Sequence, residues 1–318
     1  MKIVILDGRA LNPGDLSYDC INQFGEVTLY QHTDPEDTVA RIADHEIILV
    51  NKVPITEEVL AACPNVKLIC VQATGYNVVD CEAAARRNIP VCNVPSYGTA
   101  AVAQFTLALM LEFCHRIGLH DAVVHDGKWC RSTNFCFWDT PQMELGGKTL
   151  GIIGFGKIGQ AVAKLAQAFG MKTIAYSRTP KPEFNELARQ VTLDELLATS
   201  DFISLHCPLF AETEKLINTD TIAKMKDGAV LINTARGGLL DEEAVAEALR
   251  SGKLAGLAVD VVSEEPMKET NPLLTAPNCI ITPHMAWAPT ESRQRLLDCV
   301  VENIRSYLNG KPQNVVNM

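Results

Sequence analysis

The sequence predicts an α/β protein of two domains, each built on a parallel β-sheet covered by helices. Three observations predict this class. Short runs rich in Val and Ile alternate with helical segments along the chain, as in parallel sheets whose strands are buried on both faces. These strand-like runs fall into two series, separated by one long apolar segment. The length of 318 residues suits two domains of ordinary size.

The first series of candidate strands lies in the first hundred residues. Each candidate is short, and turn or helix-capping residues follow it. The candidates are Lys2–Leu6, Val27–Tyr30, Ile47–Asn51, Leu68–Gln72 and Val91–Asn93. After them we expect one long, strongly apolar helix over Ala100–Ile117, and then an aromatic-rich segment without periodicity over His120–Leu145.

The second series follows that segment and has the same character. Its candidates are Thr149–Ile153, Thr173–Tyr176, Phe202–His206, Ala229–Asn233, Leu257–Val261 and Cys279–Thr282. A helix is expected over Gln160–Phe169, and a final helix over Glu291–Leu308 ends at Asn309-Gly310, a C-terminal capping signal. We expect the chain to cross between its domains in the helix after Gly98 and in the stretch after His284.

Composition excludes several classes of protein. With 47% hydrophobic and 21% charged residues, the chain is neither disordered nor fibrous. A net charge of −10 argues against nucleic acid as a partner, since phosphate binding needs clustered Lys and Arg. The longest apolar runs, such as Ile47–Val50, are far shorter than the roughly 20 residues of a membrane helix, so no membrane partner is expected.

Cysteine and histidine usage indicates neither a metal site nor a secreted protein. None of the eleven cysteines forms a Cys-x-x-Cys pair, which argues against a zinc site or a redox dithiol and favours a reduced, cytoplasmic setting. His115, His120 and His125 recur every five residues, and this spacing does not align them on one helix face. No metal is predicted.

The strongest local motif is a glycine-rich turn over Gly154–Gly159, directly after a strand and opening a helix. In such a turn the first glycine allows the tight bend, the second lets the backbone approach a pyrophosphate, and the third lets helix and strand pack closely. The helix N-terminus adds N–H donors and a partial positive charge. We therefore predict a dinucleotide site, with a purely structural turn as the alternative. Its cofactor-binding residues are Gly154, Gly156, Lys157, Ile158 and Gly159.

The end of the next strand bears on which dinucleotide binds. Sites that prefer NAD usually have an Asp or Glu there for the ribose hydroxyls, but this strand ends in Ser177, Arg178 and Thr179. These side chains can donate to, and pair with, a 2′-phosphate. The sequence therefore favours NADP(H) over NAD(H); the alternative is that Arg178 is a solvated loop residue and NAD binds.

Three further side chains follow later strands, where open α/β sheets bind their ligands. Arg236 can hold a substrate carboxylate and polarise its carbonyl, and His284 can donate a proton as hydride reaches the carbon. Glu265 can pair with His284 and favour its charged form near neutral pH. Each residue alone has a common structural role, as salt-bridge partner, helix cap or core histidine. Together, behind one dinucleotide turn, they favour the reduction of a 2-oxo acid.

These motifs resemble those of the D-isomer-specific 2-hydroxyacid dehydrogenases, over essentially the whole chain. The shared segments are the glycine-rich turn, Asn233–Gly238, Asp241–Gly252, Asp260–Pro266 and Pro283-His284. The resemblance implies that Arg236, Glu265 and His284 are catalytic. It also implies a discontinuous, flavodoxin-like substrate domain over residues 1–98 and 289–318, and a Rossmann domain over 99–288 with a dimerisation segment at 100–145.

Within that family, four segments are similar to the glycerate dehydrogenase branch, the hydroxypyruvate and glyoxylate reductases. They are Asn93–Gly98, Phe135–Thr140, His284–Ala288 and Gly310–Asn317. The resemblance implies reduction of hydroxypyruvate or glyoxylate to D-glycerate or glycolate. Two alternatives are a non-catalytic dinucleotide sensor, like the corepressors that resemble C-terminal binding proteins, and a formate dehydrogenase. Formate oxidation needs no Glu–His acid pair, so Glu265 favours 2-hydroxy acids.

The resemblance also implies roles for further residues. Backbone N–H groups in the loop Ala73–Asn77 would hold the substrate carboxylate, which adds Thr74 and Gly75 to Arg236 and His284 as substrate-binding residues. The implied cofactor contacts are Cys207 and Pro208 on the adenine side, Thr213 near the phosphates, Thr234 and Ala235 around the nicotinamide, and Asp260 on its carboxamide.

A homodimer is expected from the apolar helix and the aromatic segment. The helix over Ala100–Ile117 is apolar almost all round, and Trp129–Trp138 carries two tryptophans together with Phe135 and Phe137. The alternative is a loop folded over its own core. Relatives pair through this region, and the resemblance implies that Trp138 reaches the partner's substrate pocket; ordinary packing is the alternative for this residue.

Overall fold

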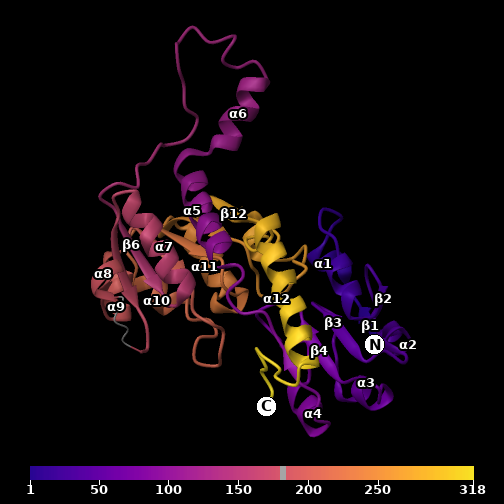
Figure 1. Ribbon diagram of the computed structural model, residues 1–318. Helices are drawn as coiled ribbons and strands as arrows, with labels where there is room; N and C mark the ends of the chain where they lie inside the picture. Colours follow the sequence, from indigo (N-terminus) through magenta and orange to yellow (C-terminus); the bar gives the residue numbers. More distant parts are fainter. Residues whose placement is uncertain (180–183) are drawn as a thin grey trace. The chain divides into compact units, whose positions relative to one another are not determined.

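The computed structural model describes residues 1–179 and 184–318. The chain divides into two compact units. Unit 1 consists of Met1–Gly98 with Trp287–Met318, and unit 2 consists of Thr99–Ala286. The second crossing therefore falls at Trp287, within the stretch after His284 and two residues before the boundary at 289 that the resemblance implied. Both units are α/β structures with parallel sheets, which confirms the predicted fold class (Figure 1).

Unit 1 contains a five-stranded parallel sheet in the order β2-β1-β3-β4-β5. Ile3 in the first strand lies opposite Val27 on one side and Ile47 on the other. All side chains of β3 and β4 are buried, which explains their unbroken apolar sequences. The strands are β1 (Lys2–Ile5), β2 (Glu26–Leu29), β3 (Ile47–Val50), β4 (Leu68–Val71) and β5 (Val91–Cys92).

Short helices and one long one cover this sheet. The long C-terminal helix packs Leu296, Val300 and Ile304 against strand residues such as Ile5, so both ends of the chain build one core. The helices are α1 (Gly8–Leu11), η1 (Asp19–Phe24), η2 (Pro35–Asp37), α2 (Thr38–Ile42), α3 (Glu57–Ala62), α4 (Cys81–Arg86) and α12 (Thr290–Leu308), where η marks a 3₁₀ helix.

An ion pair ties the start of α12 to the N-terminal segment of unit 1. The buried guanidinium of Arg293 donates through Nη1 to Asp15 Oδ1 at 2.7 Å and through Nη2 to Oδ2 at 2.5 Å. This guanidinium lowers the pKa of Asp15 to about 2. The geometry is the bidentate one that arginine favours with carboxylates. The C-terminal residues are also bonded to the N-terminal part of unit 1, since Val316 N–H donates to the Val91 carbonyl at 2.9 Å.

Among its described residues, unit 2 forms a seven-stranded sheet in the order β12-β11-β10-β9-β6-β7-β8, with every pair parallel. The strand order reverses between β6 and β9, as in Rossmann folds, which bind ligands at such a switch point. The strands are β6 (Thr149–Ile153), β7 (Lys172–Tyr176), β8 (Arg189–Gln190), β9 (Phe202–Leu205), β10 (Ala229–Asn233), β11 (Leu254–Val259) and β12 (Cys279–Ile281).

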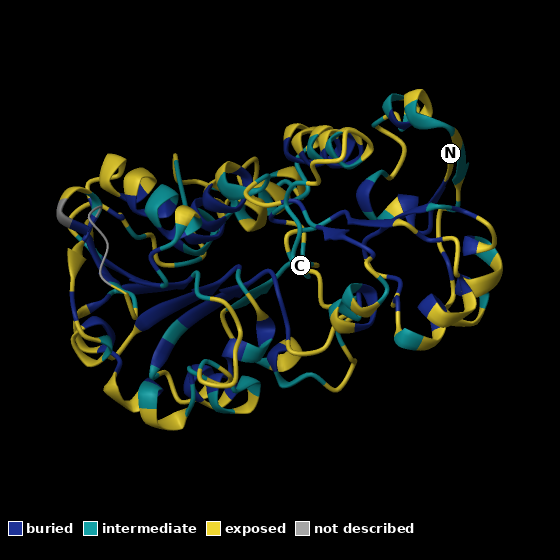
Figure 2. Cartoon of the chain, turned by 60° about the horizontal axis from the view of Figure 1, so that its bottom comes forward, coloured by how far each residue is buried: buried dark blue, intermediate teal, exposed yellow. Residues whose placement is uncertain are grey.

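The helices of unit 2 turn their exposed sides away from buried strands (Figure 2). They are α5 (Thr99–His115), α6 (Ile117–His125), α7 (Lys157–Ala168), α8 (Phe184–Leu187), α9 (Leu193–Thr199), α10 (Thr219–Lys224), η3 (Gly237–Leu239), α11 (Glu242–Arg250) and η4 (Pro272–Thr275). In α5, Phe113 approaches Gly256 of β11 so closely that a Cβ there would overlap its ring.

The prediction of one continuous helix over Ala100–Ile117 is wrong at its C-terminal end. The helix breaks at Arg116, whose φ of 47° is left-handed, and α6 then continues at an angle of 55°. The segment expected to be irregular from His120 is therefore helical as far as His125. No single helix among the described residues is long and apolar enough to span a membrane; α5 and α6 meet that criterion only as this bent pair.

Candidate functional site

The glycine-rich turn joins β6 to α7 at the switch point of the sheet. Gly154 has a φ of 95°, and a Cβ there would overlap the backbone nitrogen of Cys207. A Cβ on Gly159 would overlap the carbonyl oxygen of Gly154, whereas one on Gly156 would meet nothing within 4 Å. The outer two glycines are thus needed by the protein's own packing, and the middle one leaves open space at the helix N-terminus. That space fits the close approach of a pyrophosphate.

Asn233, the last residue of β10, shapes the loop that carries Arg236. Its buried amide donates through Nδ2 to the Arg236 carbonyl at 2.9 Å and accepts at Oδ1 from Ala235 N–H at 3.0 Å. The exposed Arg236 side chain donates to the Ala235 carbonyl at 2.7 Å and forms no ion pair with any residue that the structure describes. Its positive charge is therefore available to an anionic ligand.

His284 and Glu265 lie in direct contact. His284 Nδ1 lies 2.6 Å from Glu265 Oε2, and the other carboxylate oxygen accepts from Val262 N–H at 3.2 Å. The two side chains are 33% and 34% exposed, so a ligand can reach them. A carboxylate facing Nδ1 assigns the hydrogen to that nitrogen and directs proton exchange to Nε2.

The buried carboxylate of Asp260 fixes the segment that carries His284. It accepts from Thr282 Oγ1 at 2.6 Å, from Met285 N–H at 2.9 Å and from Ala286 N–H at 2.8 Å. Between these anchors His284 adopts a φ of 53°, a conformation that costs energy for a non-glycine residue. Asp260 thus orients the histidine from the end of β11, a role that could not be predicted from its position after a strand alone.

Comparison with known proteins agrees with the family that the sequence motifs predicted. Residues 107–286 match the model of the NAD-binding domain of D-isomer specific 2-hydroxyacid dehydrogenases. The chain belongs to this family. The family predicted from the glycine-rich turn and the three strand-end loops is thereby confirmed.

Individual relatives of the dehydrogenase match along its whole length. A hydroxypyruvate reductase of Blautia hydrogenotrophica is 54% identical over 100% of both chains, and a glycerate dehydrogenase of Methylorubrum extorquens is 41% identical over 99% of this chain and 98% of its own. A solved structure from Thermus thermophilus has a TM-score of 0.88 at 36% identity and covers 99% of this chain and 100% of its own. The corepressor-like and formate dehydrogenase alternatives are not favoured.

The loops after β7 and β9 lie together in the dehydrogenase. The exposed Arg178 guanidinium lies 5.6 Å from the centroid of the Phe210 ring, an aromatic that the sequence analysis missed. Thr213 closes the second loop, since its hydroxyl donates to the Pro208 carbonyl at 2.8 Å and accepts from Phe210 N–H at 2.8 Å. Burial raises the pKa of the Cys207 thiol, which argues for packing over reactivity. Ser177 is half-buried and Thr179 is exposed beside Arg178.

Other predicted contacts are engaged inside unit 2. Thr106 Oγ1 lies 3.0 Å from Thr234 Oγ1 and 2.8 Å from the Val102 carbonyl. Because Thr106 uses its hydrogen on that carbonyl, Thr234 donates to Thr106, and its hydroxyl points at α5. Ala235, next in the chain, is half-buried in the Arg236 loop.

In unit 1, the loop after β4 is held at both sides. Thr74 Oγ1 donates to the Val94 carbonyl at 2.8 Å, and Asn93 Nδ2 donates to the Thr74 carbonyl at 2.8 Å. In this fully described unit, the backbone N–H groups of Thr74 and Gly75 have no protein acceptor. They are thus two donors on a fixed loop.

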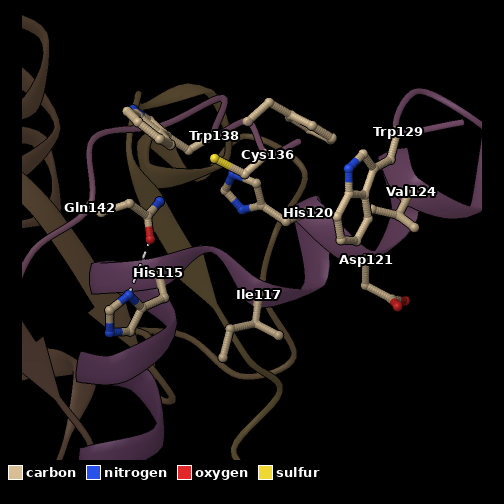
Figure 3. Close-up of a pocket in the computed structure, with 10 residues that line it drawn as sticks. His115, Ile117, His120, Asp121, Val124, Trp129, Cys136, Trp138 and Gln142 are labelled. Atoms are coloured by element: carbon tan, nitrogen blue, oxygen red, sulfur yellow. Dashed lines mark hydrogen bonds between the residues drawn. The ribbon is translucent and has the colours of Figure 1, made fainter. Parts of the chain in front are cut away.

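The segment after α5 forms an arm, α6 with residues 126–142, that extends away from the sheet of unit 2 (Figure 1). No residue of α6 is buried, and Phe135 and Trp138 are 88% and 66% exposed. The arm and His115, the last residue of α5, line an open pocket of about 630 Å³ between aromatic side chains and histidines (Figure 3). Large exposed apolar side chains of this kind are common at interaction sites.

The histidines that line this pocket make hydrogen bonds within the chain. His115, at the end of α5, has its Nδ1 3.1 Å from Gln142 Oε1, a contact drawn as a dashed line in Figure 3. His120 Nδ1 lies 2.8 Å from the Arg116 carbonyl, while its Nε2 accepts from Asp139 N–H at 3.0 Å. In the described parts of the chain, no group of three or more His, Cys, Asp or Glu residues could hold a metal ion.

Proposed function

We propose that this dehydrogenase reduces small 2-oxo acids, hydroxypyruvate and glyoxylate above all, to D-glycerate and glycolate. The contact of 2.6 Å between His284 and Glu265, on loops anchored by Asp260 and Val262, carries the proposal. The activities after which the two relatives are named, hydroxypyruvate reductase and glycerate dehydrogenase, support this choice of substrate.

Each of the chain's own site residues has a separate role in this reaction. The exposed guanidinium of Arg236 binds the substrate carboxylate and polarises the adjacent carbonyl. The bound nicotinamide dinucleotide supplies the hydride. His284 donates a proton from Nε2 to the carbonyl oxygen, and Glu265 stabilises the imidazolium that must be present beforehand. In unit 1, the N–H groups of Thr74 and Gly75 are suited to bind a carboxylate.

Turnover assays test this function. We expect the purified protein to oxidise NADPH or NADH with hydroxypyruvate and glyoxylate, and to leave formate and NAD(P)⁺ unchanged. Chiral chromatography of the product should find D-glycerate. Dinucleotide binding without turnover of any 2-oxo acid would instead support the sensor alternative.

Gly156 provides a test of the dinucleotide site that is separate from folding. A Cβ at Gly156 meets no protein atom within 4 Å and its φ is −80°, so Gly156→Ala should fold normally yet weaken dinucleotide binding about tenfold or more. Gly159→Ala should instead lower the Tm, because its Cβ overlaps the Gly154 carbonyl. Thermal melts and fluorescence titration with NADPH measure the two effects. An unchanged affinity of Gly156→Ala for NADPH would show that the pyrophosphate does not bind at this turn.

For the remaining cofactor contacts we propose NADP(H) as the preferred dinucleotide. Ser177, Arg178 and Thr179 would surround the 2′-phosphate, with Phe210 beneath the guanidinium; Cys207, Pro208 and Thr213 would form the adenine side. Lys157 and Ile158 would lie against the pyrophosphate, and Thr234, Ala235 and Asp260 near the nicotinamide.

Arg178→Ala tests that preference. Losing a charge-assisted contact should lower kcat/KM for NADPH about tenfold or more and leave kcat/KM for NADH within about threefold. Arg189→Ala is the matched control, since Arg189 is also exposed but pairs with Glu195 at 2.7 Å. A wild-type preference for NADH, unaltered by Arg178→Ala, would contradict the proposal.

We further propose that the arm binds a second copy of the chain, with Trp138 reaching the partner's substrate site. Light scattering at micromolar concentration should then give twice the mass of one chain. Trp138→Ala should change the ratio of kcat/KM between hydroxypyruvate and glyoxylate, while Trp138→Phe restores most of it and neither changes dinucleotide affinity. A particle of one chain mass would reject the dimer.

A cytoplasmic location is proposed on the state of the cysteines. All eleven lie among the described residues as free thiols, and burial raises the pKa of several, including Cys92 and Cys279 to about 11. Such thiols suit a reducing compartment.

A further inference from the structure

Glu242, the first residue of α11, makes hydrogen bonds that its own helix does not need. Its Oε1 accepts from Ser263 N–H at 2.7 Å, and its Oε2 accepts from Ser263 Oγ at 2.7 Å and from Asn271 Nδ2 at 2.9 Å. The capping role belongs to Asp241, whose side chain accepts from Ala244 N–H. The carboxylate of Glu242 therefore stabilises the two segments that contain Ser263 and Asn271.

Those segments flank Glu265 in the sequence, and Ser263 is only two residues before it. Val262, the residue before Ser263, donates its N–H to Glu265 Oε1 at 3.2 Å, which folds the Glu265 side chain back onto its own turn. The other carboxylate oxygen is the one that meets His284. The position of Val262 and Ser263 thus decides where Glu265 presents its carboxylate.

The same turn contacts the loop of Arg236. A Cβ on Gly237 would overlap the backbone of Val262 and Ser263, so the two loops touch backbone to backbone. Since a displacement of this turn would move both loops, Glu242 is placed to influence Arg236 as well as Glu265.

We propose that Glu242 is a positioning residue for the reaction: it fixes the Val262–Glu265 turn so that Glu265 stays against His284 and the Arg236 loop stays in place. The inference rests on the proposed roles of these three residues. Charge matters to it, because all three donors are uncharged groups that a carboxylate binds more strongly than an amide does. In Glu242→Gln, the amide NH₂ would also face at least one of those donors.

Kinetics of Glu242→Gln test the proposal. We expect kcat for hydroxypyruvate to fall about ten- to a hundredfold, because small displacements of catalytic groups are costly. The dissociation constant of NADPH should stay near that of the wild type. Glu243→Gln is the matched control, since Glu243 is exposed on the same turn of α11 and its side chain has no partner in the described part of the chain. Ser263→Ala, which removes one bond, should give a smaller loss of kcat and guards against a misfolded Glu242 variant.

A double variant separates positioning from general stabilisation. If Glu242 acts through Glu265, adding Glu242→Gln to Glu265→Gln should lower kcat by less than about threefold further, and Glu242→Gln alone should move the pH–rate profile in the same direction as Glu265→Gln. Independent, multiplying losses with an unmoved profile would overturn the proposal, as would wild-type kcat in Glu242→Gln. Wild-type kcat in Glu265→Gln would overturn the proposed function itself, and this inference with it.

Discussion

Replacing His284 with Gln is expected to lower kcat for hydroxypyruvate about 10²- to 10⁴-fold, the range that a positioned general acid contributes. Glutamine can still donate a hydrogen bond to Glu265, so the loop need not move, but it has no proton to give at neutral pH. The dissociation constant of NADPH should stay within about threefold, since the glycine-rich turn is untouched. Stopped-flow reduction and equilibrium titration measure the two quantities.

Two further variants sharpen this result. His32→Gln is the control, because His32 is exposed in unit 1 and its Nε2 lies 3.0 Å from Asp34 Oδ1. Glu265→Gln should lower kcat less than His284→Gln, because the proton donor remains while only the carboxylate that orients it is replaced. If His284→Gln turns over hydroxypyruvate at the wild-type rate, His284 is not the acid.

The fold class could be predicted because buried parallel strands have a strong local pattern. Thr149–Ile153 and Ala229–Asn233 match their predicted bounds, since unbroken apolar runs end where polar residues begin. Strand β8 was missed, because Arg189 and Gln190 are exposed and too few to show a period. The break at Arg116 was missed for the opposite reason: apolar residues continue on both sides of it, and a left-handed arginine has no marker in the sequence.

Some residues of the candidate site could likewise be predicted from the sequence, and others could not. Arg236, Glu265 and His284 could be proposed because parallel strands bring the loops that follow them to one edge. Asn233, Glu242 and the anchoring role of Asp260 could not be seen, since each depends on a hydrogen bond whose partner is known only once the loops are folded. The last of these joins residues 26 positions apart in the sequence. A polar residue after a strand indicates that a loop begins there, but it does not indicate the direction of its side chain.

Replacing Arg236 with Ala should lower kcat/KM for hydroxypyruvate about 10³-fold or more, because one guanidinium both binds the carboxylate and polarises the carbonyl. Arg236→Lys should recover only part of this loss, as lysine keeps the charge without the planar fork. The Tm should not fall in either variant, since the side chain is exposed and the loop is held by Asn233 and Gly237. Arg189→Lys serves as the control, and a melt accompanies each kinetic measurement. A folded Arg236→Ala variant that keeps kcat/KM would show that the substrate carboxylate binds elsewhere, and a lowered Tm would contradict the expectation that this side chain is not needed for folding.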